Sequence, residues 1–159
     1  MMNGGGTAAI DIVRADVGDA AAILALQRLA YRQEAQLYHD PDLPPLRETL
    51  TELVAAFETH VILKAIVQGE LVGSVRAYSC DGICFIGRLM VHPRLQRRGI
   101  GTALMGQIEA YFPDVERFQL FTGARSAANI RLYRRLGYTI VATEDVNDRV
   151  RLVIMTKPA

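Results

Sequence analysis

Short runs in which apolar and polar residues alternate follow one another along this chain, separated by longer stretches with apolar residues three and four positions apart. The alternating runs predict strands at residues 9–13, 61–67, 71–79, 83–91, 117–122, 138–143 and 150–157. The helical spacing predicts helices at 20–38, 46–57 and 127–136, and one more that starts after Gly101 and ends at Pro113.

Turn residues mark the ends of these elements. An Asp within residues 14–19 is the expected N-cap of the first helix, and Ser126 is the expected N-cap of the helix at 127–136. Gly137 is suited to the left-handed residue that ends that helix. Three prolines in residues 39–45 predict an irregular loop before the helix at 46–57.

The order of elements is strand, two helices, three strands, helix, strand, helix and two strands. Helices that connect inner strands imply parallel pairing at the centre of the sheet, with antiparallel hairpins beside it. We therefore expect an α/β fold with a mixed sheet of about seven strands and about four helices. Residues 9–159 are expected to form a single domain, and residues 1–8 a flexible N-terminal lead.

Composition narrows the range of partners. The formal net charge is only +1, which gives no reason to expect nucleic acid as the main partner. No run of 18 apolar residues exists, and the N-terminus lacks the basic start and apolar centre of a signal peptide. We expect a cytoplasmic protein with no membrane partner.

The two cysteines, Cys80 and Cys84, flank an Asp-Gly turn. A two-residue hairpin loop pairs Cys80 with Ile83 and Ser79 with Cys84, so the thiols do not lie opposite each other. The expectation is two small unlinked thiols, with no disulfide and no metal site.

The strongest chemical signal lies where the strand at 83–91 ends. A basic turn with glycines at 99 and 101 leads there into a helix. Such a turn aims several main-chain N–H groups at one point, and the positive end of the helix dipole adds to the stabilisation of an anion. No Lys follows either glycine, which excludes the P-loop pattern. Position 104 is Leu, which excludes the dinucleotide fingerprint.

The string Gln96-x-x-Gly99-x-Gly101, preceded by Val91-His92-Pro93, resembles the coenzyme A loop of the GCN5-related N-acetyltransferase (GNAT) family, Q/R-x-x-G-x-G/A. A second segment, which runs from Asn129 to Tyr138, is similar to the family's N-x-x-L-Y-x-x-L-G-Y helix. The resemblance covers nearly the whole chain after the first eight residues. It implies the acyl-CoA N-acyltransferase fold, with acetyl-CoA as co-substrate, no metal, and an amine as acetyl acceptor.

The resemblance also implies roles for individual residues. Tyr133 would protonate the departing thiolate, Asn129 would bond the pantetheine arm, and the main-chain N–H of Met90 would polarise the thioester carbonyl. The full coenzyme-binding set that the resemblance implies is Leu89, Met90, Val91, Gln96, Arg97, Arg98, Gly99, Ile100, Gly101, Thr102, Asn129 and Tyr133.

The sequence departs from one familiar family pattern at a position where the general base is expected. Some members carry a Glu where this chain has Phe85. Glu34 is the first substitute, because Tyr31, Glu34 and Tyr38 lie three and four apart on one helix face that leads into the proline loop. These three residues form the expected acceptor-binding set, although a surface Glu between two half-buried tyrosines would show the same spacing. His39 is a weaker candidate for the base.

The sequence leaves the acceptor open among a peptide N-terminus, a protein lysine and a small amine. A non-catalytic acyl-CoA-binding sensor on the same fold is the alternative function, and an O- or succinyltransferase is a third option. A homodimer through the two terminal strands is possible.

Overall fold

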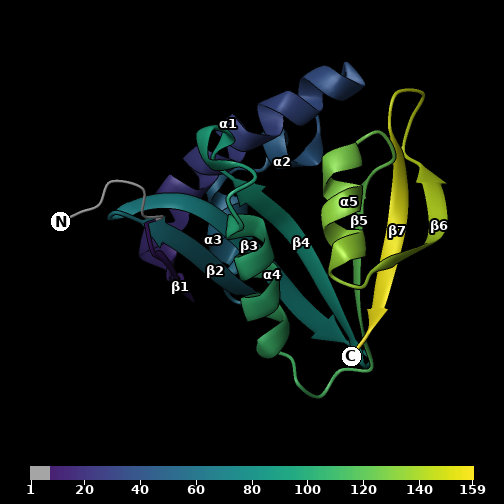
Figure 1. Ribbon diagram of the computed structural model, residues 1–159. Helices are drawn as coiled ribbons and strands as arrows, with labels where there is room; N and C mark the ends of the chain where they lie inside the picture. Colours follow the sequence, from purple (N-terminus) through teal and green to yellow (C-terminus); the bar gives the residue numbers. More distant parts are fainter. Residues whose placement is uncertain (1–7) are drawn as a thin grey trace.

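The computed structural model describes residues 8–159, and the sequence-predicted lead falls almost entirely outside this range. Its centre is one seven-stranded sheet in the order β1-β2-β3-β4-β5-β7-β6 (Figure 1). The strands are β1 (Ile10–Arg14), β2 (Val61–Val67), β3 (Glu70–Cys80), β4 (Ile83–Val91), β5 (Arg117–Gly123), β6 (Thr139–Asp145) and β7 (Arg151–Pro158). The predicted α/β fold with a mixed sheet of about seven strands is confirmed.

Five α-helices connect these strands: α1 (Ala20–Tyr38), α2 (Pro44–Arg47), α3 (Leu50–Ala56), α4 (Ile100–Ala110) and α5 (Ala127–Arg135). Helices α1 and α3 cover one face of the sheet, with Ile23, Leu53 and Ile62 in their shared core. Helices α4 and α5 lie over the opposite face (Figure 1), and Leu104 and Tyr133 are buried in that second core. None of the helices in residues 8–159 combines the length and the apolar character that a membrane crossing requires.

The single helix predicted at 46–57 is wrong in one respect, because the helical conformation is interrupted at Glu48. Its backbone is extended there (φ −57°, ψ 130°), and α2 ends at the preceding residue. Pro44 and Pro45 open α2, at helix positions where proline loses no intrahelical hydrogen bond. Thr49 then starts α3 with a capping box, since its side chain and that of Glu52 each accept the other's main-chain N–H.

The hairpin between β3 and β4 pairs as predicted, with Cys80 opposite Ile83 and Ser79 opposite Cys84. Both thiols are free, and Cys84 is fully buried. Parallel pairing at the centre is also confirmed, because β4 runs parallel to β5. The two strands pair over only three residues each, and the gap that opens beyond them forms the candidate site described below.

Candidate functional site

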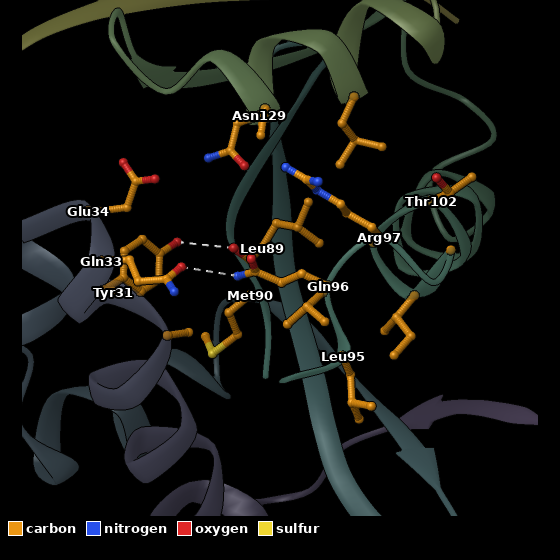
Figure 2. Close-up of a pocket in the computed structure, with 17 residues that line it drawn as sticks. Tyr31, Gln33, Glu34, Leu89, Met90, Leu95, Gln96, Arg97, Thr102 and Asn129 are labelled. Atoms are coloured by element: carbon orange, nitrogen blue, oxygen red, sulfur yellow. Dashed lines mark hydrogen bonds between the residues drawn. The ribbon is translucent and has the colours of Figure 1, made fainter. Parts of the chain in front are cut away.

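The two central strands separate soon after they start to pair. Only residues 83–85 of β4 pair with residues 117–119 of β5. Beyond Phe85 the rest of β4 keeps β3 as its only strand neighbour, and a cleft opens on its other side. Figure 2 shows this cleft with α1, which carries Tyr31 and Glu34, on one side and α5, which carries Asn129, on the other.

A β-bulge in β4 lies beside this cleft. Gly87 pairs with Arg76 and Met90 pairs with Ser74, so two residues of β4 oppose one residue of β3. Arg88 in the bulge has a left-handed backbone (φ 51°), which is costly for a residue with a side chain. Strained bulges of this kind redirect side chains and are common beside active sites.

The regular part of β4 after the bulge fixes which main-chain groups face the cleft. The N–H of His92 donates to the carbonyl of Val72 on β3 at 2.7 Å. Strand groups alternate in direction, so Met90 also turns its main chain toward β3, while the N–H of Val91 faces away from it. On the cleft side, the carbonyl of Leu89 accepts a hydrogen bond from the Tyr31 hydroxyl at 3.2 Å. This alternation does not support Met90 as the polarising N–H that the resemblance implies.

The glycine turn presents an unusual number of free donors. None of the seven consecutive main-chain N–H groups of residues 96–102 donates a hydrogen bond within the described part of the chain. Gly99 is the N-cap of α4 and has φ 83°, a conformation that favours glycine. A Cβ there would meet nothing within 4 Å, so the turn is open to an incoming group. These donors and the α4 dipole suit an anion such as a diphosphate.

A cavity of about 280 Å³ lies between this turn, α1 and α5, and we call it the glycine-loop cavity. Arg97 also lines it and extends across the cleft in Figure 2. The predicted coenzyme-binding residues that line it are Leu89, Met90, Val91, Gln96, Arg97, Gly99, Ile100, Gly101, Thr102 and Asn129. Arg98 is exposed and lies outside the lining, and Tyr133 lines a different cavity.

That second cavity, of about 250 Å³, lies under the proline-containing loop, and we call it the proline-loop cavity. Tyr38 and Tyr133 line it, together with Pro44 and Pro45. Four residues line both cavities: Tyr31, Glu34, Leu89 and Asn129. The two cavities therefore meet at one point in the cleft, and two molecules that enter from opposite sides could react there.

A chain of hydrogen bonds fixes Glu34 at this junction. The Ser126 hydroxyl donates to Glu34 Oε2 at 2.6 Å, so it must accept from the Tyr38 hydroxyl at 2.8 Å. The Tyr38 oxygen in turn accepts the main-chain N–H of Arg125 at 2.9 Å. Ser126 occupies the N-cap position of α5 as predicted, but it makes no side-chain cap because its hydroxyl is committed to Glu34.

Two phenols at the cavities are held in the neutral form. Burial raises the pKa of Tyr31 to about 12, which outweighs the opposing effect of the Arg88 charge. Burial also raises the pKa of Tyr133 well above its ordinary range, with smaller contributions from Tyr31 and Glu34. The Tyr133 hydroxyl makes no hydrogen bond to another described residue, so its proton is available to a bound molecule.

Two sequence positions considered for the general base lie outside both cavities: Phe85, where the family Glu is missing, and the weaker candidate His39. Phe85 stacks on Tyr78 with ring centroids 5.2 Å apart and lines neither cavity. His39 is exposed at the end of α1 and also lines neither. Sequence reasoning missed Arg88 and Ser126. The glycine before Arg88 inside a strand is a signal for a bulge, whereas nothing in the local sequence points from Ser126 to Glu34.

Residues 21–138 match the acetyltransferase (GNAT) family, which is about three quarters of the chain. The chain belongs to the GNAT family. The two motifs that resemble it, in the glycine turn and in α5, lie within the matched residues and on opposite sides of the cleft.

Solved GNAT-like structures agree with this fold. The PaiA N-acetyltransferase from Thermoplasma acidophilum, in complex with coenzyme A, superposes with a TM-score of 0.78 at 16% identity and covers 95% of this chain and 99% of its own. YncA from Salmonella typhimurium, a putative acetyltransferase with acetyl-CoA, gives a TM-score of 0.73 at 23% identity and 94% coverage of both chains. At sequence identities this low, the structural similarity shows a shared fold alone.

A curated relative is similar in sequence over a shorter span. The UPF0157 protein YqkA from Bacillus subtilis is 29% identical over 119 residues, which is 75% of this chain. This chain spans about a third of the length of that relative, since the match covers 34% of it.

Proposed function

We propose that this GNAT protein transfers an acetyl group from acetyl-CoA to an amine by direct attack of the amine on the thioester. One observation carries the proposal: the two cavities meet at Tyr31, Glu34, Leu89 and Asn129. A protein that only bound the coenzyme would have no need for a second cavity that opens onto the same point.

The glycine-loop cavity fits the coenzyme. The unpartnered N–H groups of residues 96–102 would donate hydrogen bonds to the diphosphate oxygens, and the Arg97 guanidinium would add a positive charge beside them. The pantetheine arm would lie along residues 89–91 of β4, with Asn129 across the cleft. Cleft-side main-chain N–H groups of Leu89 and Val91, rather than that of Met90, would stabilise the developing oxyanion. A donor in such a position contributes about 3 kcal/mol in other enzymes.

The acceptor amine would enter through the proline-loop cavity. An alkylamine has a pKa of about 10.4, so only a small fraction is unprotonated at neutral pH, and a base must take its proton. We assign this role to Glu34, whose Oε2 is anchored by Ser126 while Oε1 accepts no hydrogen bond from the described residues. As the amine nitrogen bonds to the carbonyl carbon, the C–S bond breaks, and the Tyr133 hydroxyl would donate its proton to the thiolate.

The test is thiol release from acetyl-CoA in the presence of a panel of amines that includes amino acids, peptides and polyamines. We expect release with at least one acceptor and mass-spectrometric detection of the acetylated amine. Calorimetric binding of coenzyme A, with no release for any amine, would favour a non-catalytic sensor. No binding would contradict the assignment of the glycine turn.

A further inference from the structure

Arg88 is a cation on the lining of the proline-loop cavity that the proposed reaction does not use. It stands in the β4 bulge with a left-handed backbone. Its side chain is only 19% exposed. A strained, half-buried arginine beside an acceptor cavity needs an explanation, because both features cost stability.

The nearest anion does not satisfy Arg88. Both oxygens of Glu48 accept hydrogen bonds from Arg76, at 3.2 and 3.0 Å, and Glu48 Oε1 also accepts one from Gln27. The Nε of Arg88 lies 3.6 Å from the same Oε1, which is too long for a hydrogen bond. This Nε is buried without a partner, and no nitrogen of the guanidinium donates a hydrogen bond to another described residue. Two guanidinium groups thus share one carboxylate, with a surplus positive charge on Arg88.

The electrostatics of the site agree with this geometry. Burial, and then the charge of Arg76, lower the pKa of Arg88 despite the opposing effect of Glu48. Arg47, which lines the same cavity, is exposed and forms no ion pair with a described residue. The proline-loop cavity therefore has an unsatisfied affinity for an anion at Arg88.

The lining of the same cavity also carries negative charge. Glu34 lies at the junction with the glycine-loop cavity, and Asp40 and Asp42 also line the proline-loop cavity. Tyr31 lines both cavities, and the charges of Arg88 and Glu34 both act on its phenol, in opposite directions. A ligand with a positive and a negative group at its two ends would match this arrangement.

We propose that the acetyl acceptor is a small amine that also carries a carboxylate, such as a free amino acid, with its carboxylate held by the Arg88 guanidinium and its amine at Glu34. The proposal rests on the acetyl transfer proposed above. A guanidinium can hold a carboxylate through two parallel N–H donors, which would fill the hydrogen-bonding positions that Arg88 leaves open. The cavity, at about 250 Å³, lies just below the range of drug-sized ligand sites, which suits a molecule as small as an amino acid.

Matched acceptors test this directly. Each free amino acid is compared with its carboxamide, which keeps the amine and the side chain but loses the negative charge. We expect kcat/KM to be about tenfold or more higher for the preferred free amino acid than for its carboxamide. Polyamines and peptide N-termini should behave like the carboxamide. Equal or better use of carboxamides, peptides or polyamines would overturn the proposal.

Variants locate the effect at Arg88. In Arg88→Gln the ratio of the two kcat/KM values should fall to near one, and Arg88→Lys should keep part of it. The matched control is Arg117→Gln, which removes an exposed arginine at the start of β5 and should leave the ratio unchanged. Because the ratio is measured within one preparation, a partly unfolded variant does not distort it. An unchanged ratio in Arg88→Gln would contradict the assignment.

A binding measurement separates this inference from the proposed reaction. With coenzyme A present, the preferred free amino acid should raise the melting temperature of the wild type but not that of Arg88→Gln, and the carboxamide should raise neither. That result without any thiol release would keep the carboxylate site and reject the acetyl transfer. Acetyl transfer that does not distinguish the free amino acid from its carboxamide would keep the proposed reaction and reject the carboxylate site.

Discussion

Ser126 donates its hydroxyl proton to the carboxylate of Glu34 across 92 positions of sequence, and the two side chains join α5 to α1 over the cleft. The same hydroxyl accepts from Tyr38, so the direction of every hydrogen bond in this chain is fixed. A base that is held on one oxygen keeps its position while the other oxygen receives a proton. Ser126 is therefore a positioning residue in the proposed mechanism.

Ser126→Ala should lower kcat by roughly tenfold, because Glu34 loses the group that orients it. It should also lower the free energy of unfolding by about 1–3 kcal/mol, since the buried Tyr38 hydroxyl loses its acceptor. Ser79→Ala is the matched control, because it removes an exposed serine hydroxyl on β3 that lines neither cavity. Steady-state kinetics and thermal melts measure both. Equal kcat values in the two variants would reject the positioning role.

Gly99→Glu should weaken coenzyme A binding by more than about tenfold. The new carboxylate would stand at the N-terminus of α4, among the donors that should hold the diphosphate. Gly99→Ala serves as a first control, because it carries the strain of a positive φ without the charge. Gly106→Glu serves as a second, since it places the same charge on an exposed position of the same helix with no neighbour within 4 Å. Calorimetric titration should give a much lower affinity for coenzyme A in Gly99→Glu than in either control.

Tyr133→Phe should reduce kcat by about a hundredfold while KM for acetyl-CoA changes little, because the phenol is needed only as the thiolate forms. Stability should hardly change, since this hydroxyl has no hydrogen-bond partner among the described residues. Tyr138→Phe is the informative comparison: its ring lies 6.0 Å from that of Tyr133, and its hydroxyl donates to Glu109 at 2.7 Å. That variant should lose stability and retain kcat. A wild-type kcat in Tyr133→Phe would remove the residue from catalysis.

Local pattern was enough to predict most strands and the glycine turn, because alternation and turn residues act over a few positions. The strand predicted at 83–91 is observed with the same bounds as β4, and Gly137 has the left-handed backbone (φ 100°) expected of it. Most residues that the motifs predicted for coenzyme binding line the glycine-loop cavity, and Arg98 and Tyr133 do not.

Tertiary contacts decided what the sequence did not predict. The apolar spacing of residues 46–57 predicts a helix that continues through Glu48. In the structure the helix is interrupted at Glu48, whose carboxylate pairs with Arg76, 28 positions away. The direction of the Ser126 hydroxyl and the surplus charge of Arg88 likewise depend on residues that are distant in sequence. To predict these contacts, one must know how several helices and strands lie relative to one another. The periodicity of apolar residues within a single element does not contain that information.

Glu48 makes the stability of the fold depend on pH. Burial alone would raise the pKa of this carboxyl, but hydrogen bonds from Gln27 and Arg76, with the charges of Arg76 and Arg88, outweigh it and leave the pKa below its ordinary value of 4.5. The folded state thus prefers the ionised form. This contribution is complete above pH 4.5 and is lost as the pH falls through the lowered pKa of the folded protein.

Glu48→Gln should therefore lower the free energy of unfolding at neutral pH, by about 3 kcal/mol, since it leaves Arg76 and Arg88 facing each other without a carboxylate. The difference from the wild type should shrink as the pH falls below 4.5, because the wild-type carboxyl then also loses its charge. Glu58→Gln, at an exposed position, should match the wild type at every pH. Adding Arg88→Gln to Glu48→Gln should restore part of the loss, because it removes one of the two repelling cations. Denaturant unfolding across this pH range measures all four proteins, and a constant difference between Glu48→Gln and the wild type would show that the ionised carboxylate does not hold the cluster together.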